Sequence, residues 1–322
     1  MAPPKKAPAP IKKGMKTDDA FVTILKHNYN YARGWEPTAH QGKNIRGVHQ
    51  TRVAYRRMRS CIKNFRRAIP RELSSEMQLG MKGFASKLGP ARDLDVFQTE
   101  VLDVVGNKLT PAAGAKKLKT VVSGKRADAY DQVRSAIDGK EYAAFRKEFA
   151  AWLKNKPWRK KMSAAQLKKV NMPIEKYAAQ EMDRRFSKML AMGKNRKSMT
   201  DDQLHDLRIK GKEMRYACEF FTPLFGKAAF RDFILRLKAV QGVLGTLHDI
   251  HVGPELLEGI TSGQSDANVK KTVNNILAMR SSDERKLRKS LDGAWKKLES
   301  AKRPWGKVSG KGGKRRGRKN RK

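Results

Sequence analysis

Two copies of one pattern stand 156 residues apart in this chain of 322 residues, and this internal repeat predicts a fold of two similar units. The first copy contains VHQTRVAYRRMRS at 48–60, and the second contains HDLRIKGKEMRY at 205–216. Without a gap, the offset aligns His49 with His205, Arg52 with Arg208, Arg56 with Lys212, Met58 with Met214, Arg59 with Arg215, and Phe65 with Phe221.

A second block keeps the same offset. LGPARDLDV at 88–96 lies opposite LGTLHDIHV at 244–252, and the positions that recur are Leu88, Gly89, Asp93 and Val96, as Leu244, Gly245, Asp249 and Val252. Lys82 likewise recurs as Lys238. Because both blocks keep their separation in both copies, chance is a poor explanation. We therefore expect one repeat over residues 17–160 and another over residues 171–306.

The periodicity of the apolar residues predicts an all-α fold. Apolar residues recur at three- and four-residue spacing, and no convincing stretch alternates with a period of two. Thr200 followed by Gln203 has the form of a capping box at the start of the second motif helix. We expect two pseudo-symmetric antiparallel bundles, and the hypothesis for their arrangement is that they face each other across a basic groove.

Each motif helix has one apolar side and one basic side. At about 100° per residue, His49, Arg52, Arg56 and Arg59 fall within about 80° of one another. We call these four residues the first basic stripe, and their repeat-related partners His205, Arg208, Lys212 and Arg215 the second. Stacked like charges destabilise a helix unless an anion offsets the repulsion. Finding the stripe twice favours an anion-binding site over a solvated helix face.

The charge of the whole chain points to a polyanionic partner. Lys and Arg number 72 against 31 acidic residues, a net charge of +41. Residues 1–16 and 307–322 are expected to be disordered basic tails. When residues 1–16 and 302–322 are set aside, 56 basic and 31 acidic residues remain. The folded part is therefore strongly basic on its own.

The expected location is the cytoplasm. Cys61 and Cys218 fall on the apolar sides of their helices, as buried thiols in a reducing compartment do. No apolar run approaches the ~18 residues of a membrane span, and MAPPKKAPAPIKK lacks the apolar middle of a secretory signal. The basic end KRRGRKNRK also fits a nuclear-import sequence.

HxxRxxxRRxR at 49–59, HxxRxxxKxxR at 205–215 and LGxxRDxDV at 88–96 resemble the conserved histidine α-helical domain, CHAD. The resemblance implies two helical bundles with a central basic groove that binds inorganic polyphosphate, and association with polyphosphate granules. It implies a stand-alone CHAD protein without a CYTH domain. The polyphosphate-binding residues it implies are His49, Arg52, Arg56, Arg57, Arg59, Lys82, His205, Arg208, Lys212, Arg215 and Lys238. Asp93 and Asp249 are expected to be structural, and the hypothesis is that they hold stripe arginines in position.

The second unit departs from the pattern. Lys212 and Glu213 replace two basic residues, and His248 and His251 stand where the first unit has Arg92 and Asp95. A metal site at the two histidines would not be duplicated, so no metal is expected. Beside a polyanion the imidazolium form is favoured, which predicts tighter binding as the pH falls through the region near 6.5.

Catalytic motifs such as a P-loop, HExxH or GxSxG are missing from the sequence, so neither an enzyme nor a cofactor is expected. Binding of nucleic acid through phosphate contacts and the basic tails is the main alternative. A phosphotransfer enzyme that uses the histidines is the third. Single-strand binders interleave aromatic residues with their charges, and the stripes contain no duplicated aromatic position.

Overall fold

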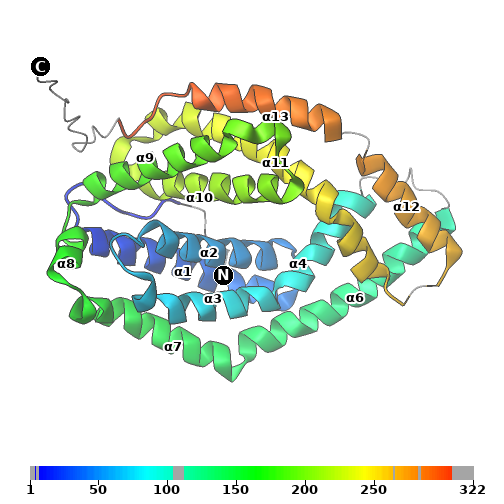
Figure 1. Ribbon diagram of the computed structural model, residues 1–322. Helices are drawn as coiled ribbons and strands as arrows, with labels where there is room; N and C mark the ends of the chain where they lie inside the picture. The colour runs from blue at the N-terminus through cyan, green and yellow to red at the C-terminus, as the bar shows by residue number, and fades with distance from the viewer. Residues whose placement is uncertain (1–3, 5–6, 104–111, 264, 282–283, 307–322) are drawn as a thin grey trace, which may run out of the picture.

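The computed structural model describes residue 4 and residues 7–103, 112–263, 265–281 and 284–306. Within these ranges every regular element is a helix, as predicted. The chain has an all-α fold (Figure 1). None of the helices in the described ranges combines the length and apolar character needed to cross a bilayer.

The first half of the chain forms the lower group of helices in Figure 1. Its elements are α1 (Thr17–Gln41), α2 (Arg46–Asn64), the short η1 (Arg71–Leu73), α3 (Ser75–Lys87), α4 (Gly89–Val96), η2 (Phe97–Leu102), α6 (Ala112–Asp138), α7 (Lys140–Asn155) and η4 (Pro157–Lys161). Helix α8 (Ala164–Val170) then leads to the second half.

The second half forms the upper group, with α12 beside α6 at one end of the molecule (Figure 1). Its elements are α9 (Ile174–Met192), η5 (Gly193–Ser198), α10 (Asp201–Phe225), α11 (Lys227–Thr261), α12 (Ala267–Ser281) and α13 (Glu284–Glu299). The predicted capping box begins α10, because the Thr200 hydroxyl accepts from the Gln203 N–H and the Gln203 side chain accepts from the Thr200 N–H.

The apolar sides of the two motif helices are in the core. In α2, Met58, Cys61 and Phe65 at its end are buried, and in α10 Met214 and Cys218 are buried. Both cysteines are free thiols, as the sequence predicted. Burial of one side of each helix leaves the opposite, basic side at the surface, so the amphipathic pattern orients both stripes.

Helices α2 and α10 lie side by side where the two halves meet (Figure 1). The rings of Phe65 and Phe221 lie 5.8 Å apart at this junction, and these two residues are related by the 156-residue offset. Arg57 pairs with Glu219, and Lys63 Nζ lies 3.5 Å from Glu213 Oε1. The 156-residue offset relates position 57 to position 213 and position 63 to position 219. The repeat-related counterpart of the Arg57–Glu219 pair is therefore the Lys63–Glu213 pair. This correspondence supports an approximate two-fold relation between the helices.

The start of the chain differs from the sequence prediction. The expectation of a disordered tail is wrong for residues 7–16, because Ala9 and Ile11 are buried among core residues. Gly14 N donates to Glu175 Oε2 at 2.9 Å, which ties the segment to α9. Composition misled here, because a proline-rich segment loses little chain entropy on ordering and two buried side chains hold it. The other predicted tail, 307–322, lies outside the described residues.

Candidate functional site

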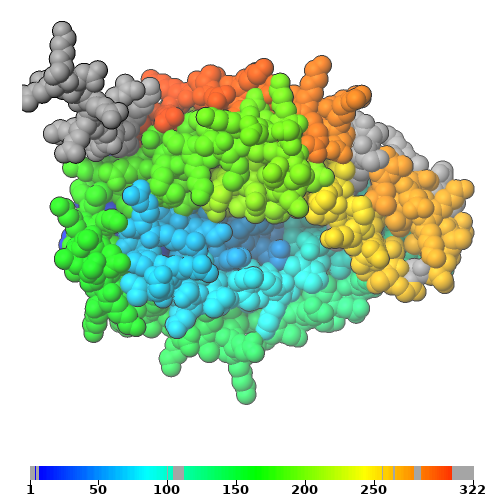
Figure 2. Space-filling model, viewed as in Figure 1, coloured from blue at the N-terminus to red at the C-terminus, as the bar shows by residue number. Residues whose placement is uncertain are grey.

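The two basic stripes meet on one face of the molecule, between α2 and α10. Figure 2 shows this face hollowed between the yellow-green upper half and the cyan lower half, with blue atoms at the bottom of the hollow. Residues from both stripes line a cavity of about 140 Å³ there: Arg56, Arg59, Ser60 and Lys63 from α2, and Ile209, Lys212, Glu213 and Tyr216 from α10. We call this hollow, with the two stripes on it, the central groove.

Arg56 and Lys212 are the repeat-related residues that come together in the middle of the groove. Burial and the positive charges of Arg208, Arg56 and Arg215 lower the pKa of Lys212 to about 8. Arg56 also lowers the pKa of Arg208 across the helix boundary. Such repulsion between stripes shows that the fold holds cations of both repeats within electrostatic reach of one another.

Four arginines of the stripes keep a buried donor without an acceptor. Among the described residues, no hydrogen-bond acceptor reaches the buried Nε atoms of Arg52, Arg59, Arg208 and Arg215. For Arg215, the Glu219 carboxylate stands 3.6 Å away. Arg52 uses one Nη1–H on the Ala85 carbonyl at 2.6 Å, which fixes its direction. Buried guanidinium donors are costly unless they are paired, and an anion in the groove would pair them.

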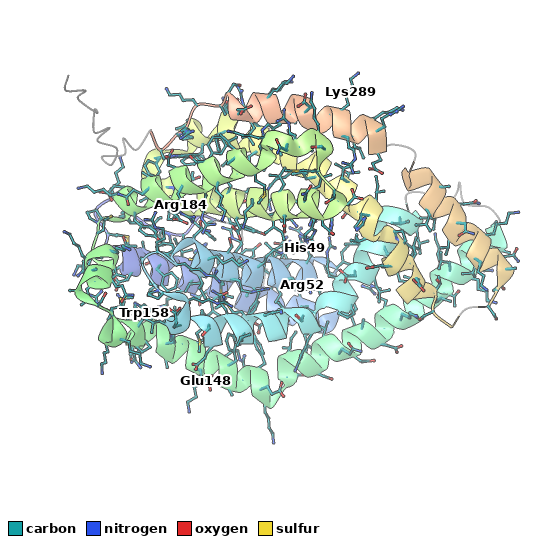
Figure 3. All side chains as sticks on the ribbon, viewed as in Figure 1. His49, Arg52, Glu148, Trp158, Arg184 and Lys289 are labelled. Atoms are coloured by element: carbon teal, nitrogen blue, oxygen red, sulfur yellow. The ribbon has the colours of Figure 1, made fainter. Side chains whose placement is uncertain are left out.

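His49 lies at the same end of the groove as Arg52 (Figure 3). Burial and the charges of Arg92, Arg56, Arg52 and Arg46 lower the pKa of His49 to about 4. In the isolated chain His49 is therefore neutral near pH 6.5. An anion must first raise its pKa before the predicted pH dependence can follow.

His205 contacts His248, with their Nδ1 atoms 3.0 Å apart, so one ring donates and the other accepts. Burial and the charge of Arg208 lower the pKa of His248 to about 4. His251 Nδ1 lies 3.5 Å from Asp201 Oδ2. In the described part of the chain, no group of three or more His, Cys, Asp or Glu side chains has the arrangement of a metal site.

Asp93 and Asp249 each lie within electrostatic reach of repeat-related arginines. Desolvation raises the pKa of Asp93, while Arg52 and Arg92 act in the opposite direction. Asp249 raises the pKa of Arg208 against the effect of burial. The proposed positioning role stays a prediction.

Arg57 is not on the groove face. The structure buries it at 6% exposure, with Nε donating to Asn28 Oδ1 at 2.7 Å and Nη1 to Glu219. The structure therefore does not support a contact between Arg57 and an anion in the groove, because position 57 turns away from the stripe toward α1 and α10. Lys82 on α3 and Lys238 on α11 are exposed, outside the lining of the cavity between the stripes.

Sequence reasoning missed Lys63, Arg46 and Arg92. Lys63 lines the groove cavity four residues after Arg59, so continuing the stripe by one turn was the signal that could have found it. Arg46 and Arg92 act electrostatically on His49. No repeat signal marks Arg92, because its partner position holds His248.

Three comparisons place the chain among known proteins. The CHAD domain family matches residues 23–258. Among solved structures, the CHAD domain from the plant Ricinus communis is 23% identical in sequence, with a TM-score of 0.77. The alignment covers 94% of this chain and 98% of the Ricinus communis chain. PptA from Streptomyces chartreusis is 13% identical in sequence, with a TM-score of 0.63. That alignment covers 88% of this chain and 100% of the PptA chain. No curated protein matches significantly. The family match spans more than half of the sequence and the fold agrees with it, so this chain belongs to the CHAD domain family.

Proposed function

We propose that this protein binds inorganic polyphosphate in the central groove, without catalysing a reaction on it. The observation that carries the proposal is the convergence of the two stripes, which leaves the buried Nε donors of four arginines without an acceptor in the described chain. Guanidinium forks suit phosphoryl oxygens, and lysine adds a point charge.

The shape of the array favours a linear anion. From His49 to Arg59 the first stripe covers eleven residues of helix, and the ten steps between them rise roughly 15 Å at 1.5 Å per residue. A single phosphate group would contact one turn of such a helix. A chain of linked phosphates can contact every turn in sequence, which matches the spacing of the cations.

Nucleic acid is the less favoured polyanion, because the groove offers few open aromatic faces. Tyr55 is buried, and its hydroxyl bonds to that of Tyr142 at 2.7 Å. Tyr216 is 4% exposed, and the Arg215 guanidinium lies 5.4 Å from its ring centre. Bases that stack on aromatic rings gain ~1–3 kcal/mol each, and these rings are not available for it.

The test is a salt series of binding by the full chain to long-chain polyphosphate, duplex DNA and single-stranded DNA, measured by titration calorimetry. The groove variant is Arg56→Gln with Lys212→Gln. The matched control is Lys147→Gln with Lys289→Gln, exposed lysines on the outer helices α7 and α13. We expect polyphosphate to bind most tightly, and the groove variant to have a log–log salt slope shallower by about 1.4, at roughly 0.7 per lost contact.

Equal affinity for all three polymers, with the groove variant and the control indistinguishable, would refute the proposal. The non-enzymatic part is checked by incubating polyphosphate with the protein and measuring released orthophosphate, which we expect to stay at the level of the protein-free sample. Association with polyphosphate granules in the cytoplasm follows from the same binding. A fluorescent fusion of the wild-type chain should co-localise with granules, and one of the groove variant should not.

A further inference from the structure

A second basic cavity, of about 570 Å³, lies between the end of α2, α9 and α10. We call it the α9 cavity. Figure 3 labels Arg184, on α9, well away from His49 and Arg52. The residues that line it are Lys63, Arg66, Arg67, Arg184, Arg185, Lys188, Lys210 and Glu213. Seven of these eight side chains are cations, so more cations line this cavity than line the smaller cavity between the stripes.

The α9 cavity adjoins the central groove. Lys63 and Glu213 line both cavities, and they form an ion pair with 3.5 Å between Nζ and Oε1. Lys63 follows Arg59 by four positions and continues the stripe into the last turn of α2, and Arg66 lies just beyond the end of that helix. From His49 to Lys63 the helix rises roughly 21 Å at 1.5 Å per residue. A polyanion that follows the stripe past Arg59 therefore reaches this cavity next.

Part of the positive charge is already balanced. Buried Glu181 pairs with Arg184 and Arg185, with 2.5 Å between Glu181 Oε1 and Arg184 Nη2. Glu213 forms two more ion pairs, with 3.1 Å between its Oε2 and Arg185 Nη1 and 3.6 Å between its Oε2 and Lys210 Nζ. Three cations remain: Arg66, Arg67 and Lys188 are exposed, and no carboxylate of the described residues pairs with them. These three side chains carry the positive charge that can pair with a ligand.

The carboxyl end of α2 also faces this region, and its carbonyl groups would repel an anion. Two of them are already engaged. Arg185 Nη2 donates to the Lys63 carbonyl at 2.6 Å, and the Tyr177 hydroxyl donates to the Asn64 carbonyl at 2.9 Å. The α9 side chains therefore remove the local obstacle to anion binding and fix α9 against α2.

The other repeat lacks the basic residues of the α9 cavity at the equivalent positions of the sequence. At the 156-residue offset, Lys63, Arg66 and Arg67 correspond to Glu219, Thr222 and Pro223, and Lys210 corresponds to Ala54. None of these four counterparts is basic. The groove itself is built from both repeats, whereas this extension exists at one end alone.

We propose that the α9 cavity is a second phosphoryl-binding site, which receives the part of a polyphosphate chain that runs past Arg59 at one end of the groove. The inference rests on the proposed function and extends it. Chains long enough to span the distance from His49 to Lys63 gain the contacts of the α9 cavity. Short chains that fill the groove do not, so affinity depends on length.

The experiment compares the full-length protein with three variants. The cavity variant is Arg66→Gln, Arg67→Gln and Lys188→Gln, and the groove variant is Arg56→Gln and Lys212→Gln. The control removes three lysines of the outer helices, Lys116→Gln, Lys147→Gln and Lys289→Gln. Each is titrated with tripolyphosphate and with long-chain polyphosphate in a salt series, after circular dichroism has established that it is folded.

For the cavity variant we expect unchanged tripolyphosphate affinity and a long-chain salt slope shallower by about 2, at roughly 0.7 per lost contact. The control should match the wild type except for the small effect of net charge. A cavity variant that binds long chains like the control, while the groove variant loses them, overturns this inference and leaves the groove intact. An equal loss for both ligands also overturns it. A groove variant that binds like the wild type overturns the proposed function itself.

Discussion

Lowering the pH should tighten polyphosphate binding, and His49 sets the size of the effect. In the isolated chain, burial and four neighbouring arginines hold its pKa at about 4. An anion in the groove neutralises those arginines, which favours the imidazolium. The ligand therefore raises the pKa of His49, and binding takes up a proton at any pH between the free and the bound value.

The magnitude follows from the two pKa values. If the bound value returns to the ordinary 6.5 from about 4, affinity rises about 30-fold between about pH 7.5 and pH 5 through this one residue. The sign is fixed, because a ligand that raises a pKa binds more tightly at lower pH. The increase begins near pH 6.5 and levels off below about pH 4. His248, whose pKa is also about 4, adds a second increment of the same sign.

The assay is a series of calorimetric titrations with long-chain polyphosphate from about pH 7.5 to 5 at constant ionic strength. His49→Gln is the matched variant, because it keeps a polar side chain that cannot become charged. The ligand is the same in both titrations, so its own protonation cancels in the ratio of affinities. Wild type and His49→Gln with the same pH dependence would refute the reasoning.

Three further predictions concern single side chains. Lys212 has a pKa of about 8 in the isolated chain, against an ordinary value of 10.5 that a bound anion would restore. Affinity should therefore fall roughly 25-fold between about pH 7 and 9.5, as the free protein loses the Lys212 proton. Lys212→Arg should remove this fall in the same titrations. Glu219→Ala leaves buried Arg57 without its carboxylate and should lower the free energy of unfolding in urea by about 3 kcal/mol. A loss below about 1 kcal/mol, the range of an exposed ion pair, would contradict this. Thr200→Ala removes the cap of α10 and should cost about 1 kcal/mol in the same assay with polyphosphate affinity retained, whereas reduced affinity at full stability would be the opposite of what we expect.

The sequence predicted the helices and the stripes well, because both follow from periodicity. Met58 and Cys61 mark the buried side of α2, and the opposite side must then carry Arg52 and Arg56. The repeat also led to the hypothesis of a shared groove, and Arg56 and Lys212 now line one cavity. Periodicity specifies which side of a helix is polar, and this was sufficient to predict the two stripes.

The sequence pattern did not predict contacts between segments that are far apart in the chain. Arg57 is as basic as Arg56, and only the packing of α10 and α1 around it decides that it pairs with Glu219. Arg184 and Lys188 reach the end of α2 because α9 packs there, and no repeat signal marks them. The segment that contains Ile11 is held by Glu175, which accepts from Gly14 N and lies far along the chain.

The antiparallel bridge between Lys16 and Pro173 has a consequence for how such a chain arose. Ile174 N donates to the Met15 carbonyl at 2.8 Å and Thr17 N donates to the Met172 carbonyl at 3.0 Å, so the starts of the two units are adjacent. Arg159 near the end of the first unit pairs with Asp18 near its start, so the two ends of that unit also meet. A unit whose ends meet can be joined head to tail to a copy of itself by a short connection, with neither copy rearranged. Gene duplication followed by fusion would therefore have needed no new architecture, only a contact surface that each copy already presented to the other.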